Sequence, residues 1–208
     1  MLQNRVNPWG QLVVVPDRGS LMGNRGILHD ASNRIVKGWA HKSWVTCLLL
    51  YKGTKRPKPF SAGNYSELFF LDEATAFAAG HRPCSYCQRQ RSNAFKAAWL
   101  SANVPPHEHA KFTLPQLDAC LHPERTRRGG GKVTYEAALA TLPTGSMFQH
   151  DINAYLVFAG RYMPWSFAGY GLAVSFPTSA VVTVLTPQSV VAAFSSGFVP
   201  YVHESAIR

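Results

Sequence analysis

Cys84 and Cys87 are the residues of this chain whose type and spacing point most directly to chemistry. A Cys-x-x-Cys sequence on a tight turn brings two thiolates to one point, an arrangement that suits tetrahedral Zn²⁺. A thioredoxin-like redox pair would instead open a helix directly after a strand, whereas here a helix and a His-Arg-Pro turn are expected before the pair. The sequence therefore predicts a zinc ion bound at this turn.

A zinc ion held by two thiolates needs two further protein ligands to complete a closed tetrahedral site. Cys47 lies in an expected strand over 44–51 that can pair with a strand over 68–71, which leads toward the turn. His29 follows a glycine-rich turn, and loops of that kind commonly carry functional groups. We therefore predict Cys47 and His29 as the third and fourth ligands, and we expect Cys120 to be a buried thiol on a helix. The nearest other imidazoles are those of His41 and His81.

A short strand, a capped helix and a rigid turn are expected to position the cysteine pair. The strand over 68–71 leads into Asp72, a favourable N-cap, and Glu73 adds negative charge to the first helical turn. Residues 74–79 are mostly alanine, a strong helix former, and Gly80 supplies the left-handed conformation that ends many helices. These signals predict a strand, a helix and a turn that together present the cysteine pair.

The rest of the chain divides at a basic, glycine-rich segment, residues 125–132. Helical spacing indicates helices over 92–102, 114–121 and 190–195. Apolar segments separated by Gly and Pro turns indicate strands over 155–158, 162–165 and 180–185. We predict an α+β fold in which a small zinc-bearing α/β part, residues 1–124, packs on a β-rich part, residues 133–208. Residues 125–132 are expected to form a flexible basic loop between them.

Positive charge is concentrated in the N-terminal part. The formal net charge is +10, and 19 of the 21 Lys and Arg residues but only 8 of the 11 Asp and Glu residues lie at or before Lys132. Cations gathered in one segment are typical of proteins that bind polyanions, chiefly nucleic acid. A small interaction module whose charge serves only solubility is the alternative. The predicted phosphate contacts are Arg82, Arg89, Arg91, Arg127, Arg128 and Lys132.

The sequence also indicates where in the cell the protein is expected to reside. No apolar run approaches the ~20 residues that a membrane helix needs. The N-terminal residues Met-Leu-Gln-Asn-Arg-Val-Asn-Pro lack the charged-then-apolar layout of a secretory signal. We therefore expect a cytoplasmic protein that does not enter the membrane, in which cysteines serve metal chemistry rather than disulfides.

The run from Phe70 to Gln88, with its Ala-Gly-His-Arg-Pro-Cys-Ser-Tyr-Cys core, resembles the second half of the zinc-binding domain of Ada-type DNA repair proteins. The segment from Gly23 to His29 is similar to a His-containing Gly-Asn turn that precedes the strand in stand-alone modules of this kind. The resemblance covers roughly residues 23–91. It implies zinc binding and a role with DNA rather than RNA, in repair or processing. The closely spaced first ligand pair of that family, which includes the methyl-accepting Cys, has no counterpart, because Asp-Ala-Ser-Asn follows His29.

Enzymatic interpretations stay open beside a structural zinc site, which four protein ligands would close. His122 and Glu124 precede the basic segment and are candidate acid/base groups of a zinc-dependent hydrolase or nuclease. Residues 83–87 have the Pro-Cys-x-x-Cys form of zinc nucleobase deaminases. Those enzymes also need an upstream His-x-Glu, whereas Tyr-Ser precedes Glu67 here.

Overall fold

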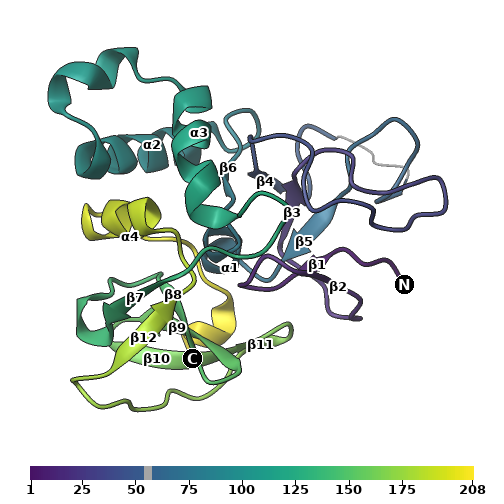
Figure 1. The fold of residues 1–208 in the computed structure, drawn as a ribbon. Helices are drawn as coiled ribbons and strands as arrows, with labels where there is room; N and C mark the ends of the chain where they lie inside the picture. The colour runs from purple at the N-terminus through teal and green to yellow at the C-terminus, as the bar shows by residue number, and fades with distance from the viewer. Residues whose placement is uncertain (54–57) are drawn as a thin grey trace.

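The computed structural model describes residues 1–53 and 58–208 and shows two sheets joined by helices (Figure 1). Each sheet has six strands. The first sheet is formed by the N-terminal part of the chain and the second by the C-terminal part, and three of the helices lie between them in sequence. The predicted α+β fold is thus confirmed. Within the described residues, no helix combines the length and hydropathy needed to cross a bilayer.

The N-terminal sheet has the strand order β2-β1-β5-β3-β4-β6. Its strands are β1 (Arg5–Val6), β2 (Leu12–Val13), β3 (Leu21–Asn24), β4 (Val45–Leu48), β5 (Leu68–Phe70) and β6 (Arg82–Pro83). β3 pairs antiparallel with both β4 and β5, so the pairing expected between the strands over 44–51 and 68–71 is wrong. Gly23 permits this insertion, because a Cβ at that position would lie 2.3 Å from the Phe70 ring.

Helix α1 (Glu73–Ala78) begins and ends where its sequence signals predict. Asp72 is the N-cap, and its carboxylate accepts the Thr75 N–H at 2.8 Å. Gly80, with a φ of +86°, leads the chain away from the helix. The other helices of this part are α2 (Arg89–Asn103), the 3₁₀ helix η1 (Pro106–Lys111) and α3 (Leu114–Arg125), so α2 starts directly after the cysteine turn.

The C-terminal sheet is antiparallel and has the order β11-β10-β9-β8-β12-β7. Its strands are β7 (Tyr135–Ala138), β8 (Met147–His150), β9 (Asn153–Phe158), β10 (Arg161–Ser166), β11 (Gly169–Tyr170) and β12 (Val181–Val184). The helices of this part are η2 (Leu139–Thr141), α4 (Gln188–Ser195) and η3 (Glu204–Ala206). The strands expected over 155–158, 162–165 and 180–185 correspond to β9, β10 and β12. β7 and β8 were not expected from the sequence.

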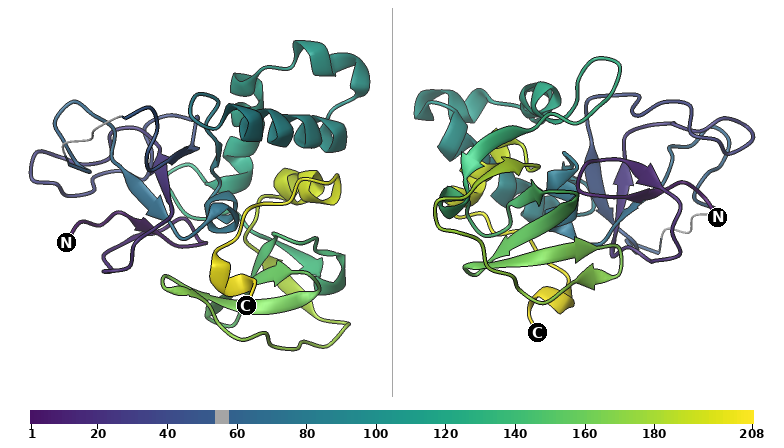
Figure 2. Two further views of the ribbon diagram at one scale, coloured as in Figure 1. Left: turned by 180° about the vertical axis from the view of Figure 1, so that it is seen from behind. Right: turned by 60° about the horizontal axis from the view of Figure 1, so that its bottom comes forward.

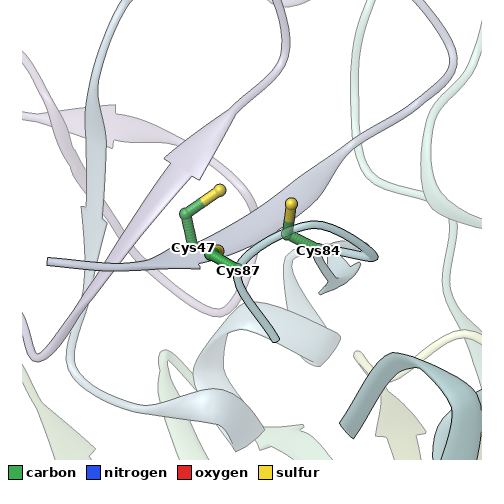
Figure 3. Close-up of side chains that lie close together, drawn as sticks. All are labelled: Cys47, Cys84 and Cys87. Atoms are coloured by element: carbon green, nitrogen blue, oxygen red, sulfur yellow. The ribbon is translucent and has the colours of Figure 1, made fainter. Parts of the chain in front are cut away.

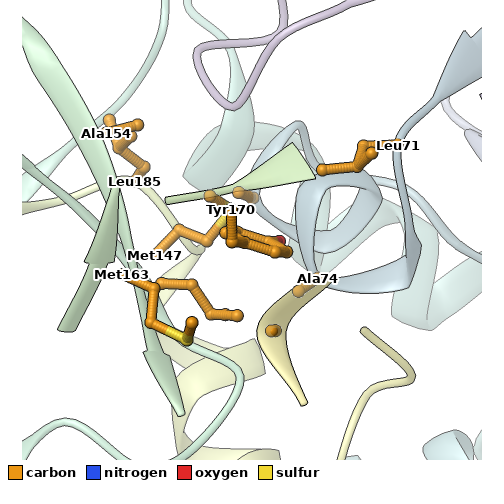
Figure 4. Packing of buried hydrophobic residues seen from close by; sticks show 10 residues of the cluster. Leu71, Ala74, Met147, Ala154, Met163, Tyr170 and Leu185 are labelled. Carbon is orange, nitrogen blue, oxygen red and sulfur yellow. The ribbon is translucent and has the colours of Figure 1, made fainter. Parts of the chain in front are cut away.

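Helix α1 lies between the two sheets and connects their cores (Figures 1 and 2). Ala74 and Ala78, which are four residues apart on one helical face, pack in a buried cluster with Met147 of β8 (Figure 4). Phe77 belongs to a second cluster that includes Phe194 of α4. The parts before and after residues 125–132 therefore share their apolar cores.

Residues 125–132, which were expected to form a flexible basic loop, begin at the last residue of α3. Arg125 is only 2% exposed, and an isolated antiparallel bridge joins Thr126 to Lys132. The ends of the segment therefore lie side by side, and its exposed part consists of Arg127, Arg128 and three glycines, each glycine with positive φ.

Candidate metal centre

The sulfur atoms of Cys47, Cys84 and Cys87 lie within 4.8 Å of one another (Figure 3). Tetrahedral zinc with Zn–S distances of about 2.3 Å separates its sulfur ligands by roughly 3.8 Å, so small side-chain rotations would bring the three onto one ion. All three side chains are partly exposed, which leaves the cluster accessible from solvent. Within residues 1–53 and 58–208, no other group of three or more metal-ligating side chains comes together.

Strand pairing brings Cys47 to the cysteine turn. β4, which carries Cys47, pairs in parallel with β6, which leads into the turn. The Thr46 carbonyl accepts the Cys84 N–H at 2.9 Å and the side-chain amide of Gln88 at 2.8 Å, so the turn is fastened to β4 at both ends. Cys47 was predicted to reach the turn, and it does so through β6 rather than through the strand that leads into α1.

Cys84 is the most acidic of the three thiols. A hydrogen bond from the Cys47 thiol is the main cause that lowers the pKa of Cys84 to about 5, and N–H groups of the turn contribute, including that of Tyr86 at 3.4 Å from the sulfur. The same contact, followed by burial, raises the pKa of Cys47 far above its ordinary value. Burial raises the pKa of Cys87. One thiolate is thus preformed, and a metal that bound all three sulfurs as thiolates would displace the other protons.

His29 does not reach the three sulfurs. Its Nδ1 lies 2.6 Å from the Ser66 hydroxyl, and its ring stacks on Phe60 with 4.6 Å between centroids. The same hydroxyl accepts the Leu28 N–H at 2.8 Å, which fastens this segment to the residues before β5. Among the described residues, no other Cys, His, Asp or Glu joins the group, so Cys47, Cys84 and Cys87 are the three side chains here that could hold a metal ion.

The other side chains considered as ligands also lie elsewhere. His81 is buried, and its Nε2 accepts the Arg25 Nε–H at 3.1 Å. Cys120, expected to be buried, is exposed, because α3 directs Leu117 and Leu121 into the core and leaves Cys120 on its outer face.

His122 and Glu124 are not brought together as an acid/base pair. The Glu124 carboxylate accepts the N–H and the hydroxyl of Ser189, at 3.0 and 2.7 Å, where α4 begins. The His122 ring instead meets the edge of Trp39, with 4.5 Å between centroids. Burial and the charge of Arg125 lower the pKa of His122. Each side chain therefore has a separate structural partner.

The basic residues predicted to contact phosphates fall into two groups. Arg82 is buried in a bidentate ion pair with Asp118, at 2.7 and 2.8 Å. The Arg91 Nε–H donates to the Glu73 carboxylate at 3.0 Å, and its guanidinium lies over the Phe198 ring. Both arginines thus stabilise the fold rather than face solvent. The exposed members are Arg89, Arg127 and Arg128, and Lys132 is half-buried.

Comparison with protein-family models, curated proteins and solved structures gave no match. The chemistry that the centre can perform is therefore inferred from its own side chains. Three soft sulfur ligands select soft or borderline metals such as Zn²⁺ or Cu⁺ over Mg²⁺ or Ca²⁺. A zinc ion held by these three thiolates alone would keep an open fourth position for water or an exogenous ligand.

Proposed function

We propose that the protein binds Zn²⁺ through Cys47, Cys84 and Cys87 and acts on or with nucleic acid. The observation that carries the proposal is the convergence of three thiol groups from β4 and the cysteine turn. Zinc is favoured because it is a borderline-soft ion that takes thiolates without redox chemistry. The resemblance of the Phe70–Gln88 run to the Ada-type zinc domain supports the same ion and a role with DNA.

Charge supports the nucleic-acid part of the proposal. Residues 1–132 carry a formal charge of +11, since they hold 19 Lys and Arg but only 8 Asp and Glu residues. Arg89 follows the cysteine turn, and Arg127 and Arg128 lie in the exposed turn after α3. These three arginines are the proposed phosphate contacts at the surface.

Metal analysis of the purified full-length protein tests the zinc site. We expect about one zinc per chain, and loss of most of it in Cys84→Ser, because two thiolates bind zinc poorly. Cys120→Ser is the matched control, since it removes an exposed thiol outside the cluster, and His29→Ala should also retain the metal. A wild-type protein that takes up no zinc, or a Cys120→Ser variant that loses it equally, would refute the site.

Salt-dependent binding to single- and double-stranded DNA tests the partner. The plot of log K against log salt should be steep, and replacing Arg89, Arg127 and Arg128 with Gln should reduce its slope by roughly one unit for each phosphate interaction removed. Arg34→Gln, at an exposed position paired with Asp30, is the control. A flat plot would leave an interaction module with a structural metal as the function.

A second candidate, a zinc-dependent hydrolase or nuclease, is favoured by the open fourth position. Zinc with three protein ligands can activate a bound water, whereas a closed site cannot. Cobalt substitution separates the two cases, because added imidazole shifts the visible absorption of Co²⁺ only where a coordination position can exchange. An unchanged spectrum would leave the metal in a structural role.

A further inference from the structure

A cavity of about 620 Å³ lies between the N-terminal segment, the start of β4 and the end of α3. Arg25, Arg125 and Lys132 line it together with three indole rings, those of Trp9, Trp39 and Trp44. No Asp or Glu among residues 1–53 and 58–208 lines this space. The cavity is thus aromatic and cationic, and its size is that of a pocket for a small organic ligand.

The two arginines are held in place by the backbone and by Trp44. Arg25 is 3% exposed and Arg125 is 2% exposed, and each guanidinium carbon lies 4.3 Å from the Trp44 ring. Arg25 donates to the Gly10 carbonyl at 3.1 Å, and Arg125 donates to the Gly80 carbonyl at 2.8 Å and to the Lys42 carbonyl. The guanidinium groups are therefore preorganised before any ligand arrives.

These contacts leave donors unused. Arg25 Nη2 and Arg125 Nε are buried without a hydrogen-bond partner. Unpaired donors on buried cations are costly and rare in folded proteins, so both guanidinium groups retain hydrogen-bonding capacity that the protein does not use. The charge of Asp118 acts on Arg125 and raises its pKa, but the Asp118 carboxylate already accepts two hydrogen bonds from Arg82.

Lys132 is a third basic residue of the cavity, and its surroundings disfavour its charged form. Its ammonium donates to the Ala78 carbonyl. Burial first, and then the charges of Arg25 and Arg125, lower the pKa of Lys132 to about 7. The corresponding pKa values for both arginines are about 9, so they are cationic at neutral pH. The cavity thus carries an excess of positive charge with no lining carboxylate to balance it.

We propose that this cavity binds a nucleotide phosphate, with Arg25, Arg125 and Lys132 on the phosphate and the indoles of Trp9 and Trp39 on the base. Guanidinium groups are suited to phosphate oxygens, and indole faces stack on nucleobases. The site is separate from the cysteine cluster and does not require the metal. It deepens the nucleic-acid part of the proposed function, on which it rests, by giving the chain a site for one nucleotide.

Two sources could supply such a phosphate: a free mononucleotide or the 5′-phosphorylated end of a strand. Calorimetric titration and thermal shift of the full-length protein distinguish them. The probes are inorganic phosphate, adenosine 5′-monophosphate, and a short single-stranded oligonucleotide with a 5′-phosphate or a 5′-hydroxyl. Preference for the phosphorylated end over the hydroxyl end identifies a strand terminus, and tight binding of the mononucleotide alone identifies a free nucleotide.

Two cavity variants and one control test the assignment. Lys132→Gln should weaken binding of the best probe about tenfold, and Arg25→Gln at least as much, because each removes a charged hydrogen-bond donor. Lys111→Gln, at an exposed lysine that does not line the cavity, should bind unchanged. Circular dichroism of each variant checks folding, and Lys132→Gln is informative even where Arg25→Gln fails to fold.

Absence of saturable binding or thermal stabilisation by every probe would overturn the site and leave the arginines as ties between elements. An equal loss of binding in Lys111→Gln and Lys132→Gln would also overturn it, in favour of diffuse surface charge. The outcome is independent of the metal. A protein that binds the probes but holds no zinc contradicts only the proposed centre, and one that holds zinc but ignores the probes contradicts only the cavity.

Discussion

At the scale of single residues, Lys132 links the electrostatics of the cavity to stability. Its pKa is lowered from 10.5 in the unfolded chain to about 7 in the fold. Between these values the unfolded chain binds a proton that the folded chain lacks, so this residue makes the free energy of unfolding rise with pH across that window. Lys132→Met removes the titration.

Urea unfolding at intervals from pH 7 to 10 measures this effect. The free energy of unfolding should increase less steeply with pH in Lys132→Met than in the wild type. Lys111→Met, at an exposed position of η1, should leave the wild-type slope unchanged. Parallel pH profiles for the wild type and Lys132→Met would show that the ammonium is not desolvated.

Gly80 is required both by its positive φ and by its close contact with Arg125, and comparison with a second glycine separates the two effects. Its φ is +86°, and a Cβ would lie 2.6 Å from the Cβ and Cδ of Arg125. Gly129 has nearly the same φ, +87°, and a Cβ there would meet nothing within 4 Å. Gly129→Ala should therefore cost only the backbone strain, about 1 kcal/mol. Gly80→Ala should cost roughly 1 to 3 kcal/mol more, because Arg125 must move.

Chemical denaturation of both glycine variants gives the comparison. Gly80→Ala should also weaken phosphate binding in the cavity, since its carbonyl orients Arg125. Equal destabilisation by the two substitutions would mean that the contact with Arg125 is readily relieved.

At the scale of elements, Asp72 joins α1 to the C-terminal part. Its carboxylate caps α1 through Thr75 and also accepts the Tyr170 hydroxyl at 2.7 Å and the His203 N–H at 2.9 Å. Asp72→Ala removes a cap worth about 1 kcal/mol and leaves two buried donors unpaired, so we expect a loss of about 3 kcal/mol in unfolding free energy. Glu108→Ala, on the exposed 3₁₀ helix, should change it by less than about 0.5 kcal/mol. A similarly small effect of Asp72→Ala would contradict this role.

Elements whose signals are local in sequence were predictable. The N-cap Asp72 and the terminating Gly80 define α1, and Thr113 with Gln116 forms the capping box that starts α3. The neighbour of β4 was not predictable from such signals, because the insertion of β3 depends on contacts between segments far apart in sequence. Gly23, which permits that insertion, carries no local mark of it.

The candidate sites follow the same rule. Cys84 and Cys87 are close in sequence and were found from spacing alone, whereas the position of His29 depends on Ser66 and could not be read from its own turn. The cationic cavity was missed, because Arg25 and Arg125 lie far apart in the sequence and neither carries a local sign of burial. Only the tertiary structure places both against one tryptophan.

At the scale of the whole molecule, the shared cores predict one cooperative unit. The cluster around Phe77 contains Phe95 and Trp99 of α2 together with Phe194 of α4 and Phe198. Tryptophan fluorescence follows mainly the N-terminal part and α2, while far-UV circular dichroism follows both sheets. Because the apolar contacts cross between the parts, we expect the two signals to report the same urea midpoint.

Phe194→Ala tests this coupling from the C-terminal side. Phe194 is 4% exposed, and its replacement should cost about 3 to 5 kcal/mol and lower the midpoint of both signals together. Leu172→Ala, at an apolar position after β11 that is 92% exposed, is the control. The substitution removes a packing partner of α1 and α2 and leaves the cysteine cluster unchanged. Unfolding of the variant in two steps would show that residues 1–124 fold without the C-terminal part. A single lowered transition would mean that the sheet carrying the cysteine cluster depends on the second sheet for its stability.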